Sequence, residues 1–105
     1  MKLLTKEIEK NLPSMYETEG IPIEDKIVRV KFFTPWGNTT WYVVEYDSNT
    51  KEFFGYVQTN PLDSEWGYFS LIELENLRGP FGLKVERDMH FDPKKFGDID
   101  LITHC

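Results

Sequence analysis

The chain has 105 residues, 40% of them hydrophobic and 15% aromatic, and its formal net charge is −6. This length fits one domain with a single core, and the composition excludes a wholly disordered chain. The acidity argues against direct nucleic-acid binding, which needs clustered lysines and arginines to displace counterions from phosphates. No stretch approaches the roughly 20 apolar residues of a membrane helix.

The only cysteine is Cys105, so the sequence holds no pair for an internal disulfide. A fold without disulfides suits a reducing compartment, and residues 1–7 meet charge again too soon for a secretory signal. These features predict a cytoplasmic protein that does not associate with membranes. Cys105 is expected to be an incidental free thiol rather than a nucleophile, because no histidine or asparagine can be placed beside it.

Residues 1–20 are expected to hold an N-terminal helix over 5–18, which Thr5 can cap. Pro13 either ends this helix early or begins a second short turn. After the Gly20 and Pro22 loop, alternation of apolar and polar residues predicts strands. The expected strands cover 27–34, 40–46, 52–58 and 66–69.

Ser70 and Glu73 form a capping box, which predicts a helix over 71–78 that Gly79 and Pro80 stop. Residues 83–91 then read as a further extended segment, and 92–105 as a loosely held tail. The sequence therefore predicts a single α+β domain over 1–105. Its centre, 27–91, is expected to be a small antiparallel meander sheet of four to five strands with the capped helix.

Acidic residues concentrate in the segment 61–79, which is expected to begin as a loop after Asn60. Four carboxylates and one arginine give it a charge of −4 + 1 = −3. They are Asp63, Glu65, Glu73 and Glu75, against Arg78. The ordinary interpretation is a solvated surface that maintains solubility, and the sharper one is a patch that binds a basic partner.

An alternating set of polar residues offers the best candidate for chemistry. On an extended segment, Glu86, Asp88, His90 and Asp92 would share one face. Glu86 and Asp88 could then hold a divalent cation, with His90 as ligand or general base. The competing interpretation is the solvent face of a half-buried edge strand. The second histidine, His104, lies near the end of the chain.

Aromatic residues crowd the predicted strands and could stack on bases or sugars. The series comprises Phe32, Phe33, Trp36, Trp41, Tyr42 and Tyr46. Roughly half of the side chains on alternating strands must face inward, so core packing is the default expectation. Trp36 differs because it lies in a predicted turn, where an exposed tryptophan would be an interface anchor.

Three ordered motifs resemble a family of short bacterial proteins of unknown function carried on conjugative plasmids, integrative elements and phage-like islands. The motifs are Lys31 to Asn38 with Thr40-Trp41-Tyr42, then Gly67 to Leu71 with Glu73-Leu74, then Arg78 to Leu83 with Glu86-Arg87-Asp88 and His90-Phe91. The resemblance covers about Leu4 to Phe91. It implies a mobile-element context but no established activity.

These observations favour a non-enzymatic accessory protein that binds another protein, through Trp36 and the four acidic residues. Inhibition of a host defence or DNA-processing factor is the form of action that the mobile-element context suggests. One alternative is a divalent-metal-dependent hydrolase or nuclease using Glu86, Asp88 and His90. Another is a nucleotide- or sugar-binding module. The main interpretation involves no cofactor or metal, and the sequence leaves the oligomeric state open.

Overall fold

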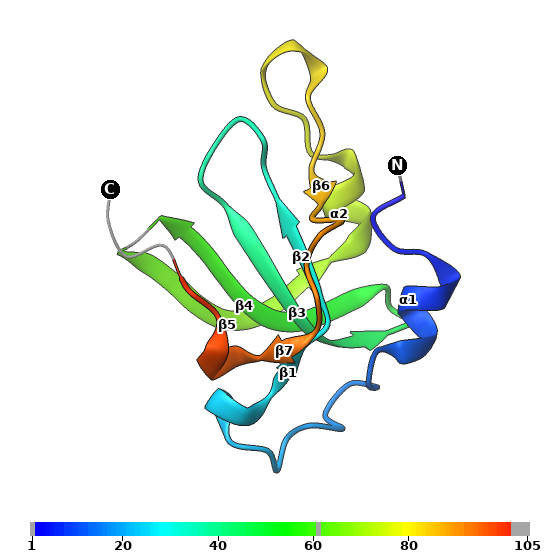
Figure 1. The fold of residues 1–105 in the computed structure, drawn as a ribbon. Coiled ribbons are helices and arrows are strands. Elements are labelled where there is room, and N and C mark those ends of the chain that lie inside the picture. Colours follow the sequence, from blue (N-terminus) through cyan, green and yellow to red (C-terminus); the bar gives the residue numbers. More distant parts are fainter. Residues whose placement is uncertain (1, 61, 102–105) are drawn as a thin grey trace.

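The computed structural model describes residues 2–60 and 62–101. Its centre is a five-stranded antiparallel sheet in the order β5-β4-β3-β2-β6 (Figure 1). These strands are β2 (Val30–Phe33), β3 (Thr40–Asp47), β4 (Glu52–Asn60), β5 (Asp63–Ser70) and β6 (Glu86–Arg87). A separate ribbon pairs β1 (Ile27–Val28) with β7 (Lys94–Lys95). The broad α+β class and the antiparallel sheet are thus confirmed.

The helices are shorter than the sequence predicted. They are α1 (Lys6–Asn11), α2 (Leu71–Asn76), and the 3-10 turns η1 (Ile23–Asp25), η2 (Pro80–Gly82) and η3 (Phe96–Asp98). Thr5 Oγ1 caps α1 by accepting from the Ile8 amide, and Ser70 Oγ caps α2 by accepting from the Glu73 amide. α1 ends at Asn11 because Leu12 precedes a proline and is extended.

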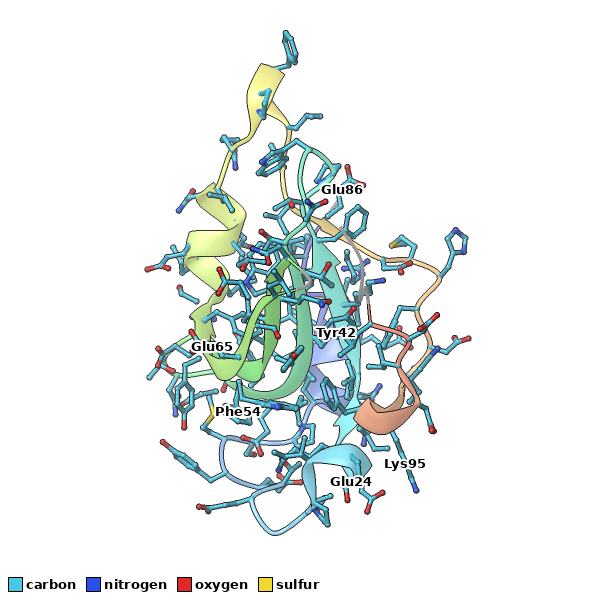
Figure 2. The ribbon with its side chains drawn as sticks, turned by 90° about the vertical axis from the view of Figure 1, so that its left-hand side faces the viewer. Glu24, Tyr42, Phe54, Glu65, Glu86 and Lys95 are labelled. Atoms are coloured by element: carbon cyan, nitrogen blue, oxygen red, sulfur yellow. The ribbon has the colours of Figure 1, made fainter. Side chains whose placement is uncertain are left out.

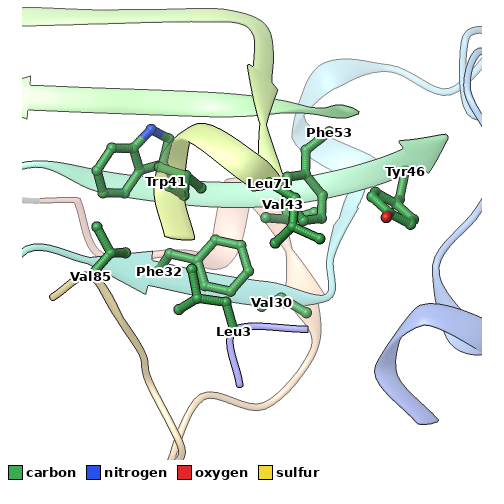
Figure 3. Packing of buried hydrophobic residues seen from close by; sticks show 10 residues of the cluster. Leu3, Val30, Phe32, Trp41, Val43, Tyr46, Phe53, Leu71 and Val85 are labelled. Carbon is green, nitrogen blue, oxygen red and sulfur yellow. The ribbon is translucent and has the colours of Figure 1, made fainter. Parts of the chain in front are cut away.

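One face of the sheet carries the larger hydrophobic core (Figure 3). Strand residues from β2, β3 and β4 meet Leu3 at the start of the chain, the buried stripe of α2, and Val85. The buried members are Leu3, Val30, Phe32, Trp41, Val43, Tyr46, Phe53, Leu71, Leu74 and Val85. Phe53 links two of its aromatic members, with its ring centroid 5.5 Å from that of Phe32 and 4.8 Å from that of Tyr46.

The opposite face of the sheet is covered by the segment after β6. Its core centres on Val28, Tyr42 and Val44. Phe96 packs there, with its ring 4.8 Å from Tyr56 and 4.9 Å from Trp66. The expected loose tail over 92–105 therefore does not describe 94–101, where β7 pairs with β1 and apolar side chains reach the second core. Residues 102–105, with His104 and Cys105, lie outside the described part.

A β-bulge in β3 decides which face Glu45 uses. The register with β4 shifts between Val43 and Glu45, so Glu45 pairs with Phe54 and points away from the larger core. Its carboxylate is buried, and it accepts 2.9 Å hydrogen bonds from the backbone amides of Tyr16 and Thr18. It also accepts a hydrogen bond from the Thr18 hydroxyl. One strand carboxylate thus anchors the irregular chain between α1 and η1.

We expect Glu45→Gln to lower the free energy of unfolding by about 2 kcal/mol. Glutamine would remove the charge, and its NH2 group would place a donor opposite the backbone N–H of either Tyr16 or Thr18, which needs an acceptor. Urea denaturation followed by circular dichroism measures the loss. Glu52→Gln, at an exposed position of β4, is the matched control and should change stability by less than about 0.5 kcal/mol. Equal effects of the two substitutions would contradict the anchoring role.

Tyr46 provides a pH-dependent test of the larger core. Its hydroxyl is buried without a hydrogen-bond partner among the described residues. Burial, followed by the negative charges of Glu9, Glu75 and Asp47, raises the pKa of Tyr46 above its ordinary value. The unfolded chain therefore releases this proton first, so Tyr46 lowers stability as the pH rises above about 10.

We expect Tyr46→Phe to leave stability at neutral pH unchanged or raise it by up to about 1 kcal/mol, because the orphaned hydroxyl is removed. The variant should also lose less stability than the wild type at alkaline pH. Burial raises the pKa of Tyr42 as well, so part of the alkaline loss should remain. Denaturant unfolding across neutral and alkaline buffers measures both effects. Parallel pH profiles for the two proteins would show that Tyr46 does not contribute.

Candidate functional site

The four acidic candidates are all exposed but belong to two elements. Asp63 and Glu65 lie on β5, which extends further than predicted and pairs with β4 as far as Asn60 opposite Asp63. Glu73 and Glu75 lie on α2, and Glu75 is close enough to Tyr46 to influence its ionisation. β5 is an edge strand of the five-stranded sheet, so its charges also discourage pairing with another chain.

The polar set around His90 does not form one strand face. Only Glu86 and Arg87 are in β6, and the chain turns at Met89 and His90. Asp88 forms an ion pair of 3.7 Å with Lys31 and accepts from the His90 amide at 2.9 Å. Among the described residues, no group of three His, Cys, Asp or Glu side chains could hold a metal ion. The geometry therefore gives the metal-dependent alternative no assembled site.

Trp36 is not the exposed anchor that the sequence suggested. Its side chain is partly buried and packs against the larger core. It also covers Gly79, where an added Cβ would lie only 2.1 Å from the Trp36 ring. Trp36 therefore supports the backbone at the base of another loop instead of presenting itself to a partner.

The loop that Trp36 supports runs from Arg78 to Lys84, and we call it the finger. It projects beyond the sheet between α2 and β6 (yellow in Figure 1, top of Figure 2). An isolated antiparallel bridge joins Arg78 to Lys84, and the Gly79 amide donates to the Leu83 carbonyl at 2.8 Å. The turn η2 closes its tip. Hydrogen bonds and the Trp36 contact thus hold the finger in one shape.

Phe81 occupies the tip of the finger and is completely exposed, at 104% of the reference area. Its backbone is left-handed, with φ 58° and ψ 25°. Left-handed backbone costs roughly 1 kcal/mol for a residue with a Cβ, and an exposed phenyl ring makes no compensating contact within the chain. The combination of this backbone with a fully exposed ring makes Phe81 a candidate functional position.

The finger is basic in a chain that is acidic as a whole. Residues 78–84 contain Arg78 and Lys84 and no carboxylate. Arg78 is partly committed to the end of α2, since its Nη1 donates to the Glu75 and Leu77 carbonyls at 2.7 and 3.0 Å. Lys84 is exposed. An aromatic tip between two positive charges can enter an apolar pocket whose rim is negative.

Most of the aromatic residues that the sequence suggested as a stacking platform, from Phe32 to Tyr46, are buried in the two cores. A different group of aromatic side chains lines a surface cleft beside β4 and β5. A cleft of about 350 Å³ is lined by Tyr16, Phe54, Trp66 and Tyr68, with Glu45 and Lys26 among its polar residues. Phe54 and Trp66 stack with ring centroids 5.7 Å apart. A hydrogen bond with Tyr16 is the largest cause that raises the pKa of Tyr68.

Comparison with known proteins identifies a family over most of this fold. The family described as "Protein of unknown function (DUF2958)" matches residues 3–96. The chain belongs to this family. The expected membership of a family of unknown function is thereby confirmed, and the mobile-element context stays a prediction. The match extends past β7 to Phe96, beyond the Phe91 limit of those motifs. No curated protein and no solved structure matches the chain.

Within residues 2–60 and 62–101, no helix is both long and apolar enough to cross a membrane.

The finger is the feature that sequence reasoning missed, although its signal was present. One phenylalanine, Phe81, is flanked by the turn-forming residues Gly79, Pro80 and Gly82. The end of a helix does not require an aromatic residue at this position. The glycine and proline residues were interpreted only as the end of the preceding helix. An aromatic residue enclosed by turn formers indicates a side chain displayed on a loop tip.

We expect Gly79→Ala to destabilise the protein by about 1–3 kcal/mol, because the new methyl group would overlap the Trp36 ring. Urea denaturation measures the loss, and tryptophan fluorescence should shift as Trp36 moves. Gly67→Ala is the matched control, since a Cβ at Gly67 meets no atom within 4 Å. If both glycines tolerate alanine equally, the packing of Trp36 on the finger is not as described.

Proposed function

We propose that the chain is a non-enzymatic binding protein that engages another protein through the finger. The observation that carries this proposal is Phe81, a fully exposed aromatic side chain on left-handed backbone. Burial of a phenylalanine side chain is worth about 1.5–3 kcal/mol, so one inserted ring can supply much of a modest affinity. The structure holds the finger in place before binding, which limits the entropy lost on association.

The charges around the finger define the partner chemistry. Arg78 and Lys84 flank the aromatic tip, so the partner is expected to offer an apolar pocket with carboxylates at its rim. The exposed acidic pairs, Asp63 with Glu65 on β5 and Glu73 with Glu75 on α2, lie outside the finger. Their negative charge would attract basic regions of the same partner. Inhibition of a host defence or DNA-processing factor remains a proposed consequence of such binding.

The test is comparative capture from a bacterial host lysate with wild-type protein, Phe81→Ala and Phe81→Gly. We expect both substitutions to weaken capture of the same partner by about 30-fold, the effect of losing about 2 kcal/mol at a binding hot spot. Phe81→Gly should be at least as stable as the wild type, because glycine adopts this backbone without strain. Loss of binding without loss of stability separates a contact from a folding defect.

Leu62→Ser is the matched control, since Leu62 is an exposed apolar residue on a different loop at 89% of its reference area. Its capture should equal that of the wild type. Charge reversal of Asp63, Glu65, Glu73 and Glu75 then measures the acidic contribution separately. A partner that binds wild type and Phe81→Ala equally would overturn the role of the finger.

A further inference from the structure

A second cleft lies between α1 and the segment 87–93, against the start of β2. Its volume is about 390 Å³, which is within the range of small-molecule sites. Ile8 and Asn11 line it from α1, and Arg29 and Val30 line it from the sheet side. None of its lining residues belongs to the finger, so this site is independent of the proposed protein contact.

Arg29 is the feature of the cleft that folding does not explain. Its backbone is fixed, because the Arg29 amide donates to the Val43 carbonyl at 2.9 Å. Its side chain is partly buried, and Nε is fully shielded from solvent without a hydrogen-bond partner. No ion pair joins Arg29 to the described residues either. A guanidinium presents five donors, and no hydrogen bond or ion pair within the described residues holds this one, so its terminal nitrogens are available to an external acceptor.

The other charged groups of the cleft already have partners within the chain. Arg87 Nη1 donates to the carbonyls of Lys2 and Leu3, and Asp88 pairs with Lys31. The Arg87 guanidinium is thus held by backbone carbonyls, whereas that of Arg29 has neither a hydrogen bond nor an ion pair among the described residues. The charge of Arg29 attracts an anion, and the planar guanidinium fits the two oxygens of a carboxylate or phosphate.

The remaining walls of the cleft are apolar and come from two sides. Ile8 faces it from α1, while Met89, Phe91 and Pro93 face it from the segment after β6. An inorganic ion would leave these side chains unused. A ligand with a small apolar or aromatic body next to its anionic group would cover them.

We propose that this cleft binds a small organic anion. Arg29 holds its carboxylate or phosphate group, and Phe91 and Met89 pack against its apolar body. Phenyl phosphate and benzoate share this chemistry and differ in the anionic group, so they distinguish the two sources. Inorganic phosphate tests the charge without the apolar body.

The experiment titrates the full chain with each probe at constant ionic strength and follows its resonances by NMR. We expect saturable shifts for Ile8, Met89 and Phe91 with phenyl phosphate or benzoate, and weaker binding of inorganic phosphate. The tighter of the two organic probes identifies the anionic group. Absence of saturable shifts at these residues, or equal affinity for inorganic phosphate, would overturn the proposal.

Arg29→Met keeps the apolar stem of the side chain and removes its charge, so affinity should fall by about tenfold or more. The unliganded variant should be at least as stable as the wild type, because a shielded unpaired group is lost. Arg29→Lys should bind with intermediate affinity, since it keeps the charge but not the planar fork. Lys6→Met removes a charge from α1 outside the lining and should bind as the wild type does. Retained affinity in Arg29→Met would refute the assignment.

Discussion

The carboxylate of Glu45 is the interaction on which the arrangement of the N-terminal third depends. Between α1 and β1 the chain has little regular structure, and the Tyr16 backbone is left-handed at φ 69°. Such a segment needs partners for its amides, and Glu45 supplies them from the middle of the sheet. Lys26 adds to the same cluster by donating from Nζ to the Thr18 carbonyl at 2.5 Å. The bulge in β3 makes this possible, because an unbroken strand would point Glu45 into the larger core.

Both proposed binding features depend on similar long-range support. The tip of the finger is exposed, and its base is held by Trp36, whose side chain also packs against the larger core. Arg29 is positioned by a backbone hydrogen bond to β3 and faced by side chains from α1 and from the segment after β6. In each feature, contacts with the sheet or its core fix the backbone, and one side chain has no partner among the described residues. The displayed group differs: an apolar ring in the finger and an unpaired cation in the cleft.

The sequence was sufficient where local patterns decide the structure and insufficient where distant segments meet. Alternation located β3 and β4, and the capping box located the start of α2. The segment from Glu86 to Asp92 has the same alternation, yet Asp88 accepts from the His90 amide and the chain turns. Asp63 and Glu65 have poor strand propensity, but pairing with β4 overrides it. The ring of Trp36 is covered by a loop more than 40 residues later, which no local pattern reveals.

The use of both sheet faces has a consequence for synthesis on the ribosome. The larger core gathers residues from the first turn of the chain to Val85, whereas the second core needs Phe91, Phe96, Ile99 and Leu101. These side chains follow all five strands of the sheet in the sequence, so they leave the exit tunnel later than the strands do. Until then, Tyr42, Val44 and Trp66 present an uncovered apolar face on an otherwise formed sheet, and such faces invite aggregation. The nascent protein is therefore expected to be more prone to misassociation before residues 91–101 emerge than after they cover this face.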